Sequence, residues 1–231
     1  MSHGHWIVER VILGQNMTFN MDTLVTMWAA MLFLLTLAYF ATRNISIYPS
    51  KLQLIFEKIL GYFRDLANGM IGEDGEKHFP LIASLFLFIV TANLMGQLPL
   101  KIFELKAGEI ASPTNDINLT AGLAIIVLVY YVTAGVMKKK TKFLLHEFSF
   151  VGIISMFVEI LELITRPLTL ALRLFGNILA GEILISALLG ICAWGLPLPI
   201  MFFEVLVACV QALVFTMLTT VYIATAVKTE H

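Results

Sequence analysis

The segment 149–193 most constrains how this chain can fold. Its 45 residues contain no polar loop. As one helix rising 1.5 Å per residue it would be about 68 Å long, more than twice the roughly 30 Å of a bilayer's hydrocarbon core. Two upright spans would need a turn between Arg166 and Gly176, where only Pro167 and Gly176 interrupt the helical pattern. We therefore expect one long, steeply tilted helix, kinked at most.

The composition of the whole chain is typical of an integral membrane protein. Of its 231 residues, 59% are hydrophobic and only 13% are charged, and the mean hydropathy is +0.88. Soluble domains are about 25% charged. The net charge of -1 gives no reason to expect a nucleic-acid partner. We predict an all-α integral membrane protein that forms a single membrane domain, 1–231, in a lipid bilayer.

Apolar runs of about 20 residues predict the membrane spans. The segment 51–70 differs, because its apolar residues recur at helical spacing with charged residues between them, which predicts an amphipathic helix at the membrane interface. The last two helices are expected to form an antiparallel, strongly tilted hairpin. The predicted elements are an outer N-terminal segment 1–22, spans 23–41, 79–99 and 118–137, the long helix 149–193 and a return helix 199–227.

The distribution of basic residues predicts the orientation of the chain. With these spans, ten lysines and arginines fall on one side of the membrane and three on the other. Positively charged loops stay on the cytoplasmic side. We expect the N-terminus outside and the C-terminus in the cytoplasm, with a bacterial plasma membrane as the preferred location. The two remaining basic residues, Arg166 and Arg173, lie within the apolar region.

Arg173 is a permanent charge at bilayer depth, which costs about 2.5–3.5 kcal/mol even on lenient scales. At about 100° per residue, several polar residues share its helix face. Small residues beside it would let another helix approach closely. The pattern indicates a surface against which an acidic group passes or docks. The polar residues are Glu159, Glu162, Arg166 and Asn177, and the small ones are Thr169, Gly176 and Ala180.

Two further acids are predicted to lie away from this face. Glu182 follows Arg173 by nine residues, which is half a turn round the helix. Glu204 and Gln211 share a face of the return helix, seven residues apart. The hairpin can bring Glu204 toward Glu182 and Gln211 toward Arg173. The acids that precede Arg173 on the long helix would then lie on its inner side, and Glu182 and Glu204 on its outer side.

Other interpretations of these residues stay open. Arg173 could pair with Glu159 or Glu162 as a structural lock, and Asn177 and Gln211 could form interhelical hydrogen bonds worth about 1 kcal/mol each. A self-contained ion-coupled transporter is the alternative function, although the sequence has no paired halves. A structural anchor subunit is a third. We expect no cofactor, no metal and no catalytic site in the chain itself.

Four motifs resemble the a subunit of the membrane sector of F-type ATP synthases, over roughly residues 79–227. They are 170–177 (LALRLFGN) with 180–182 (AGE), 211–212 (QA) with 218–222 (LTTVY), 93–96 (NLMG) with Pro99, and 113–118 (PTNDIN). The resemblance implies a stator beside a rotating ring of c subunits, with two offset aqueous half-channels. It also implies peripheral-stalk b subunits and other ATP synthase subunits as partners.

The resemblance further implies which residues act in ion translocation. Many relatives have a histidine at one of the two outer positions, where this chain has Glu182 and Glu204, so no histidine relay is implied. If these two glutamates are close, they should titrate as a coupled pair. H⁺ and Na⁺ both stay open as the ion, because its binding carboxylate would lie on the c subunit. The implied residues are Arg173, Asn177, Gln211, Glu182, Glu204, Glu159 and Asp116, to which the polar face adds Glu162.

Overall fold

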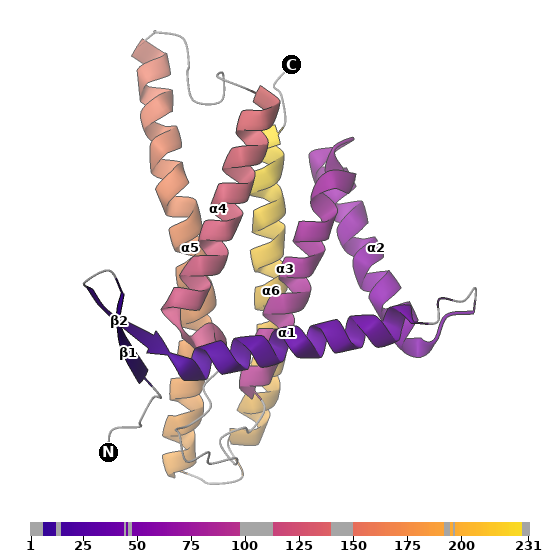
Figure 1. Ribbon diagram of the computed structural model, residues 1–231, viewed down its shortest axis with the longest axis vertical. Coiled ribbons are helices and arrows are strands. Elements are labelled where there is room, and N and C mark those ends of the chain that lie inside the picture. The colour runs from indigo at the N-terminus through magenta and orange to yellow at the C-terminus, as the bar shows by residue number, and fades with distance from the viewer. Residues whose placement is uncertain are drawn as a thin grey trace.

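The computed structural model describes residues 7–12, 15–43, 48–97, 113–139, 150–191 and 197–227, together with residues 45 and 195. The predicted helical membrane fold is confirmed, since five helices are long and apolar enough to cross a membrane. Figure 1 shows their arrangement. The elements are β1 (Ile7–Ile12), β2 (Gln15–Asn20), α1 (Met21–Thr42), α2 (Lys51–Ile71), α3 (Gly75–Gln97), η2 (Pro113–Asn115), α4 (Ile117–Lys139), α5 (Phe150–Ile191) and α6 (Pro197–Val227).

A two-stranded hairpin precedes the first helix, in the segment for which the sequence predicted no regular structure. Strands β1 and β2 pair antiparallel, with Ile7 opposite Asn20 and Ile12 opposite Gln15. Asn20 is also the residue at which the chain enters α1. The hairpin therefore passes directly into the first candidate span.

Helix α5 is one continuous helix of 42 residues, as expected for the long apolar stretch. Pro167 lies inside it and removes one backbone donor, yet the helix continues on both sides. Helix α6, 31 residues long, runs back antiparallel to α5, as Figure 1 shows. The two long helices thus form the predicted hairpin.

The first helix runs across the direction of the other long helices. Figure 1 shows α1 crossing in front of the bundle, transverse to α5 and α6. Helices that cross in this way cannot all stand upright in one bilayer. The 22 residues of α1 make about 33 Å, which fits the membrane, whereas the 42 residues of α5 make about 63 Å. Because α5 is much longer than the bilayer is thick, we expect it to be strongly tilted together with its antiparallel partner α6.

Helix α2 lies against α3 and contributes to the core through its apolar face. Phe63, Ala67 and Ile71 on this face are buried, and charged residues occupy the other side. The chain leaves α2 at Gly72, whose φ of 89° is readily available only to glycine. This turn starts α3 at Gly75, four residues before the predicted beginning of the span.

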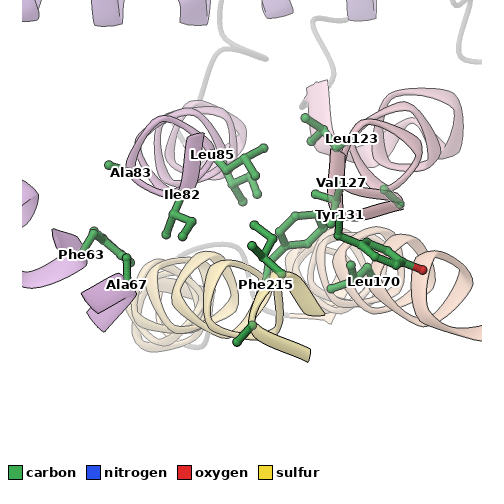
Figure 2. Packing of buried hydrophobic residues seen from close by; sticks show 14 of the residues in the cluster. Phe63, Ala67, Ile82, Ala83, Leu85, Leu123, Val127, Tyr131, Leu170 and Phe215 are labelled. Atoms are coloured by element: carbon green, nitrogen blue, oxygen red, sulfur yellow. The ribbon is translucent and has the colours of Figure 1, made fainter. Parts of the chain in front are cut away.

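The core lies where α2, α3, α4, α5 and α6 meet. Phe215 of α6 is almost fully buried, and Figure 2 shows it among side chains from α3, α4 and α5. Large apolar side chains on the outer faces, such as Trp28, Leu35 and Phe202, are exposed instead. Outward-facing apolar residues are what a helix surrounded by lipid requires.

Candidate functional site

Arg173 projects from the middle of α5 onto an open face of the protein. Its side chain is exposed, and within the described part of the chain it forms no hydrogen bond or ion pair. Thr169, Gly176 and Ala180, the small residues predicted to flank it, are exposed as well. A methyl group added at Gly176 would meet no atom within 4 Å. The face that carries the arginine is therefore uncovered and has little side-chain bulk.

Arg166 binds Glu162, one of the two acids that could have paired with Arg173. Its guanidinium donates to the Glu162 carboxylate and, at 3.4 Å, to the Thr225 hydroxyl of α6. It also lies over the ring of Tyr222, 5.0 Å from the ring centre, and 5.9 Å from that of Tyr131. The structural lock is thus formed by Arg166, which ties α5 to α6 and α4.

Two amides are buried between α6 and its neighbours. Gln211 is only 7% exposed, and its Nε2 has no hydrogen-bond partner within the described residues. Asn93 of α3 is fully buried and donates from Nδ2 to the Ala208 carbonyl at 3.2 Å. Asn177 on α5 is half-buried. In the sequence, Asn93 was noted only as part of a motif. The structure places its side chain against Ala208, which precedes Gln211 by about one turn of α6.

The two acids predicted for the outer side, Glu182 and Glu204, lie on segments of α5 and α6 that pack together beyond Arg173. Glu204 on α6 is 8% exposed and packs against Gly181 of α5. A Cβ at position 181 would overlap Glu204 Oε1 and lie 2.7 Å from Cδ. Glu182, the next residue, accepts a 2.6 Å hydrogen bond from Asn115 Nδ2 of η2. The structure thus brings Glu204 beside the segment that carries Glu182, as the hairpin argument predicted.

Asp116 fastens the short η2 turn to the start of α1. Its Oδ2 accepts hydrogen bonds from Asn20 at 2.8 Å and Thr23 at 3.0 Å, and its Oδ1 from the backbone and side chain of Asn118 at 2.9 Å. Burial alone would raise the pKa of Asp116, but these hydrogen bonds outweigh it and lower the pKa. Its carboxylate is directed to α1 and α4, whereas the adjacent Asn115 reaches Glu182.

The opposite end of the bundle carries a second ionic cluster. Asp74, in the turn before α3, is bound by Lys138 of α4 and by Lys77 at 2.7 Å. These two hydrogen bonds, that from Lys138 first, lower the pKa of Asp74 to about 2. Glu159, predicted on the same inner side, belongs to α5, but its side chain lies outside the described residues. No group suited to a metal ion occurs among the residues that the structure describes.

The fold and these polar clusters define an integral membrane protein that carries charged and amide groups between and upon its spans. The family model for the ATP synthase A chain matches residues 24–224. An ATP synthase subunit a from Gloeobacter violaceus is 39% identical over 230 residues, which cover 96% of this chain and 93% of that protein. The chain therefore belongs to the ATP synthase A chain family. This family places it in the membrane sector of an F-type ATP synthase, with ion transport for ATP synthesis as its general role and other ATP synthase subunits as its partners.

Proposed function

We propose that this chain is the stator subunit that provides two offset ion half-channels against a rotating c-ring, with Arg173 separating them. The single observation that carries the proposal is the exposed guanidinium of Arg173, which has no ion-pair partner among the described residues, on an uncovered face of a membrane-length helix. A charge in that position is costly in lipid. A ring of subunits with acidic ion-binding groups would supply both the missing partner and the missing cover.

The outer half-channel is assigned to Glu182 and Glu204; the packing of Glu204 against Gly181, the residue before Glu182, supports this assignment. Asn177 lies between Arg173 and Glu182 on α5, and Gln211 follows Glu204 by seven residues on α6. The inner half-channel is assigned to Glu159 and Glu162, which precede Arg173 by several turns of α5. Polar groups thus approach the arginine along the helix from both directions.

Electrostatics explains why one fixed cation can separate the two paths. A guanidinium about 4 Å from a carboxylate, at an effective dielectric constant near 20, favours the ionised carboxylate by about 4 kcal/mol. A rotor carboxylate must therefore release its ion before it passes Arg173. An ion that enters from the outside has to travel round with the ring to leave on the inside. Each elementary charge that crosses 100 mV delivers about 2.3 kcal/mol, which would drive rotation and ATP synthesis.

The remaining assignments follow the same proposal. The c-ring would lie against the face of Thr169, Gly176 and Ala180, and the b subunits of the peripheral stalk would hold the chain still. The N-terminus would be outside and the C-terminus in the cytoplasm of a bacterial plasma membrane. Asp116, assigned to the outer side with Glu182, would act there by holding the turn that carries Asn115.

The decisive experiment compares two arginines on the same helix. Arg173→Ala is expected to abolish ATP synthesis driven by an ion gradient while the complex still assembles. Arg166→Ala, seven residues away, is the matched control, since it removes a charge that is already paired. ATP synthase complexes that assemble with Arg166→Ala should still couple ion flow to ATP synthesis. Normal coupling with Arg173→Ala would refute the proposed function.

Cross-linking tests the position of the ring. In a background without Cys192 and Cys209, a cysteine at Ala180 should cross-link to a c subunit. A cysteine at Val129, exposed on α4, serves as the control and should not. Equal cross-linking at both positions would contradict the proposal that the c-ring lies against this face.

A further inference from the structure

Asn115 stands out because only one half of its amide group is used. Its Nδ2 donates to Glu182 Oε2 at 2.6 Å. Its Oδ1 is buried and has no hydrogen-bond partner within the described residues. A buried carbonyl oxygen without a partner is costly and uncommon in folded proteins. The free acceptor lies on the same amide group as the donor that binds the acid.

The backbone of Asn115 is held firmly from several directions. Pro113 and Thr114, the two preceding residues of η2, are buried, and η2 contacts α1, α3, α4 and α5. Asp116, the following residue, is bonded to Asn20 and Thr23. Because the backbone is fixed on both sides, the motion left to Asn115 is rotation of its side chain.

An amide suits an acid that changes its protonation state. An ionised carboxylate only accepts hydrogen bonds, whereas a protonated carboxyl group also donates one. Asn offers an NH₂ donor and a C=O acceptor at the same distance from its backbone. Rotation about its terminal torsion, which has broad and roughly two-fold preferences, exchanges the two atoms. The Asn115 amide could therefore bond Glu182 in both states.

We propose that Asn115 is a positioning residue that keeps the Glu182 carboxyl group in place beside Gly181 and Glu204, donating to it when ionised and accepting from it when protonated. The inference deepens the proposed function, on which it rests, and assigns the outer path an amide that exchanges roles as a proton comes and goes. Two titratable groups lie on the segments next to Glu182 and Asn115 in the described structure. Glu204 of α6 packs against Gly181, and the Asp116 carboxylate is bonded to α1 and α4.

The test uses the intact ATP synthase in vesicles and measures ATP-driven proton uptake as a function of pH on the side of Glu182. Asn115→Leu has a similar size and no polar atom. We expect its rate to fall about tenfold, as for loss of one hydrogen bond to a charged group. The pH midpoint should also move upward, because the bond to the ionised carboxylate is the stronger of the two that are lost. Asn115→Gln, which keeps the amide, should recover most of the rate and the original midpoint.

A purely structural role for Asn115 would give a different result. In that case Asn115→Leu would lower the rate only in proportion to the amount of assembled complex, with the midpoint unchanged, and the inference would be overturned. An unchanged rate and midpoint would overturn it as well. A double variant with Glu182→Gln should show no loss beyond that of Glu182→Gln alone, and an additive loss would contradict the inference.

Glu182→Gln by itself separates this inference from the proposed function. If that variant pumps normally, the outer path through Glu182 fails, whatever Asn115 does. If it blocks pumping while Asn115→Leu behaves like the unmodified complex, only the role of Asn115 fails.

Discussion

The carboxylate of Glu162 is bound by Arg166 and not by Arg173. Both arginines share one face of the same apolar helix. Within the part of the chain that the structure describes, Arg166 has an acid four residues away, a hydroxyl and two aromatic rings as partners, whereas Arg173 has none. The contrast separates a structural cation from one that is available to another molecule. It also answers the question whether Arg173 locks onto Glu162.

Arg166→Met should destabilise the protein without changing the chemistry at Arg173. The variant loses the ion pair with Glu162 and the contacts with Tyr222 and Tyr131. Because the pair is partly exposed, we expect a loss of about 1–3 kcal/mol in the free energy of unfolding. The measurement is thermal unfolding of the purified complex. Combining it with Glu162→Gln should recover part of the loss, and a larger loss in the double variant would contradict the assignment.

Gly181→Ala tests the close approach of Glu204 to α5. The new methyl group would overlap the Glu204 carboxylate, so we expect a loss of stability of about 1–3 kcal/mol. Glu204→Asp, which shortens the side chain, should relieve part of it. Gly190→Ala on the same helix is the control, because its methyl group would meet nothing within 4 Å, and it should be neutral or slightly stabilising. Thermal unfolding that ranks the two alanine variants equally would argue against the contact.

Asp116 should make the stability of the protein depend on acid. Its pKa in the folded protein is lowered, below the unfolded value of about 3.9. Its stabilising contribution is therefore complete above the unfolded pKa and is lost as the pH falls through the folded pKa. Melting temperatures recorded between pH 7 and pH 3 should fall less steeply for Asp116→Asn than for the unmodified protein. Parallel curves would show that the bonds to Asn20 and Thr23 contribute little.

The contribution of Asp74 to the stability of the protein should be small and should depend on the salt concentration. Its folded pKa of about 2 means that its contribution holds above the unfolded value and disappears as the pH falls toward about 2. The lysines that bind it are largely exposed, so Asp74→Asn should cost no more than about 1 kcal/mol in dilute buffer. At about 1 M salt, where screening acts within about 3 Å, the difference should vanish. A cost that persists at high salt would indicate a role beyond charge pairing.

The sequence predicted those features that depend on local periodicity. The unbroken α5, its antiparallel partner and the grouping of Glu162, Arg166 and Arg173 on one face all follow from apolar runs and the helical repeat. The approach of Glu204 to the Glu182 segment followed from the hairpin. Each of these needs only one or two neighbouring elements.

Features that join distant segments could not be predicted in this way. The hydrogen bond from Asn115 to Glu182 links residues 67 positions apart, and that from Asn20 to Asp116 links residues 96 apart. No periodic pattern specifies such partners. The β1–β2 hairpin has only short strands, whose signal is weak. Whether Glu162 pairs with Arg166 or with Arg173 depends on the position of α6, because α6 supplies Thr225 and Tyr222 as further partners of Arg166.

The crosswise course of α1 has a consequence for how deep water must reach. If α1 is upright, α5 and α6 lie aslant, and each end of this hairpin comes near one surface of the bilayer. Each half-channel proposed above would then need to extend only from that surface to the polar side chains on the nearer half of the hairpin, rather than through the full hydrocarbon thickness of about 30 Å. The membrane barrier would be thinned locally by the slope of two helices, without a continuous pore.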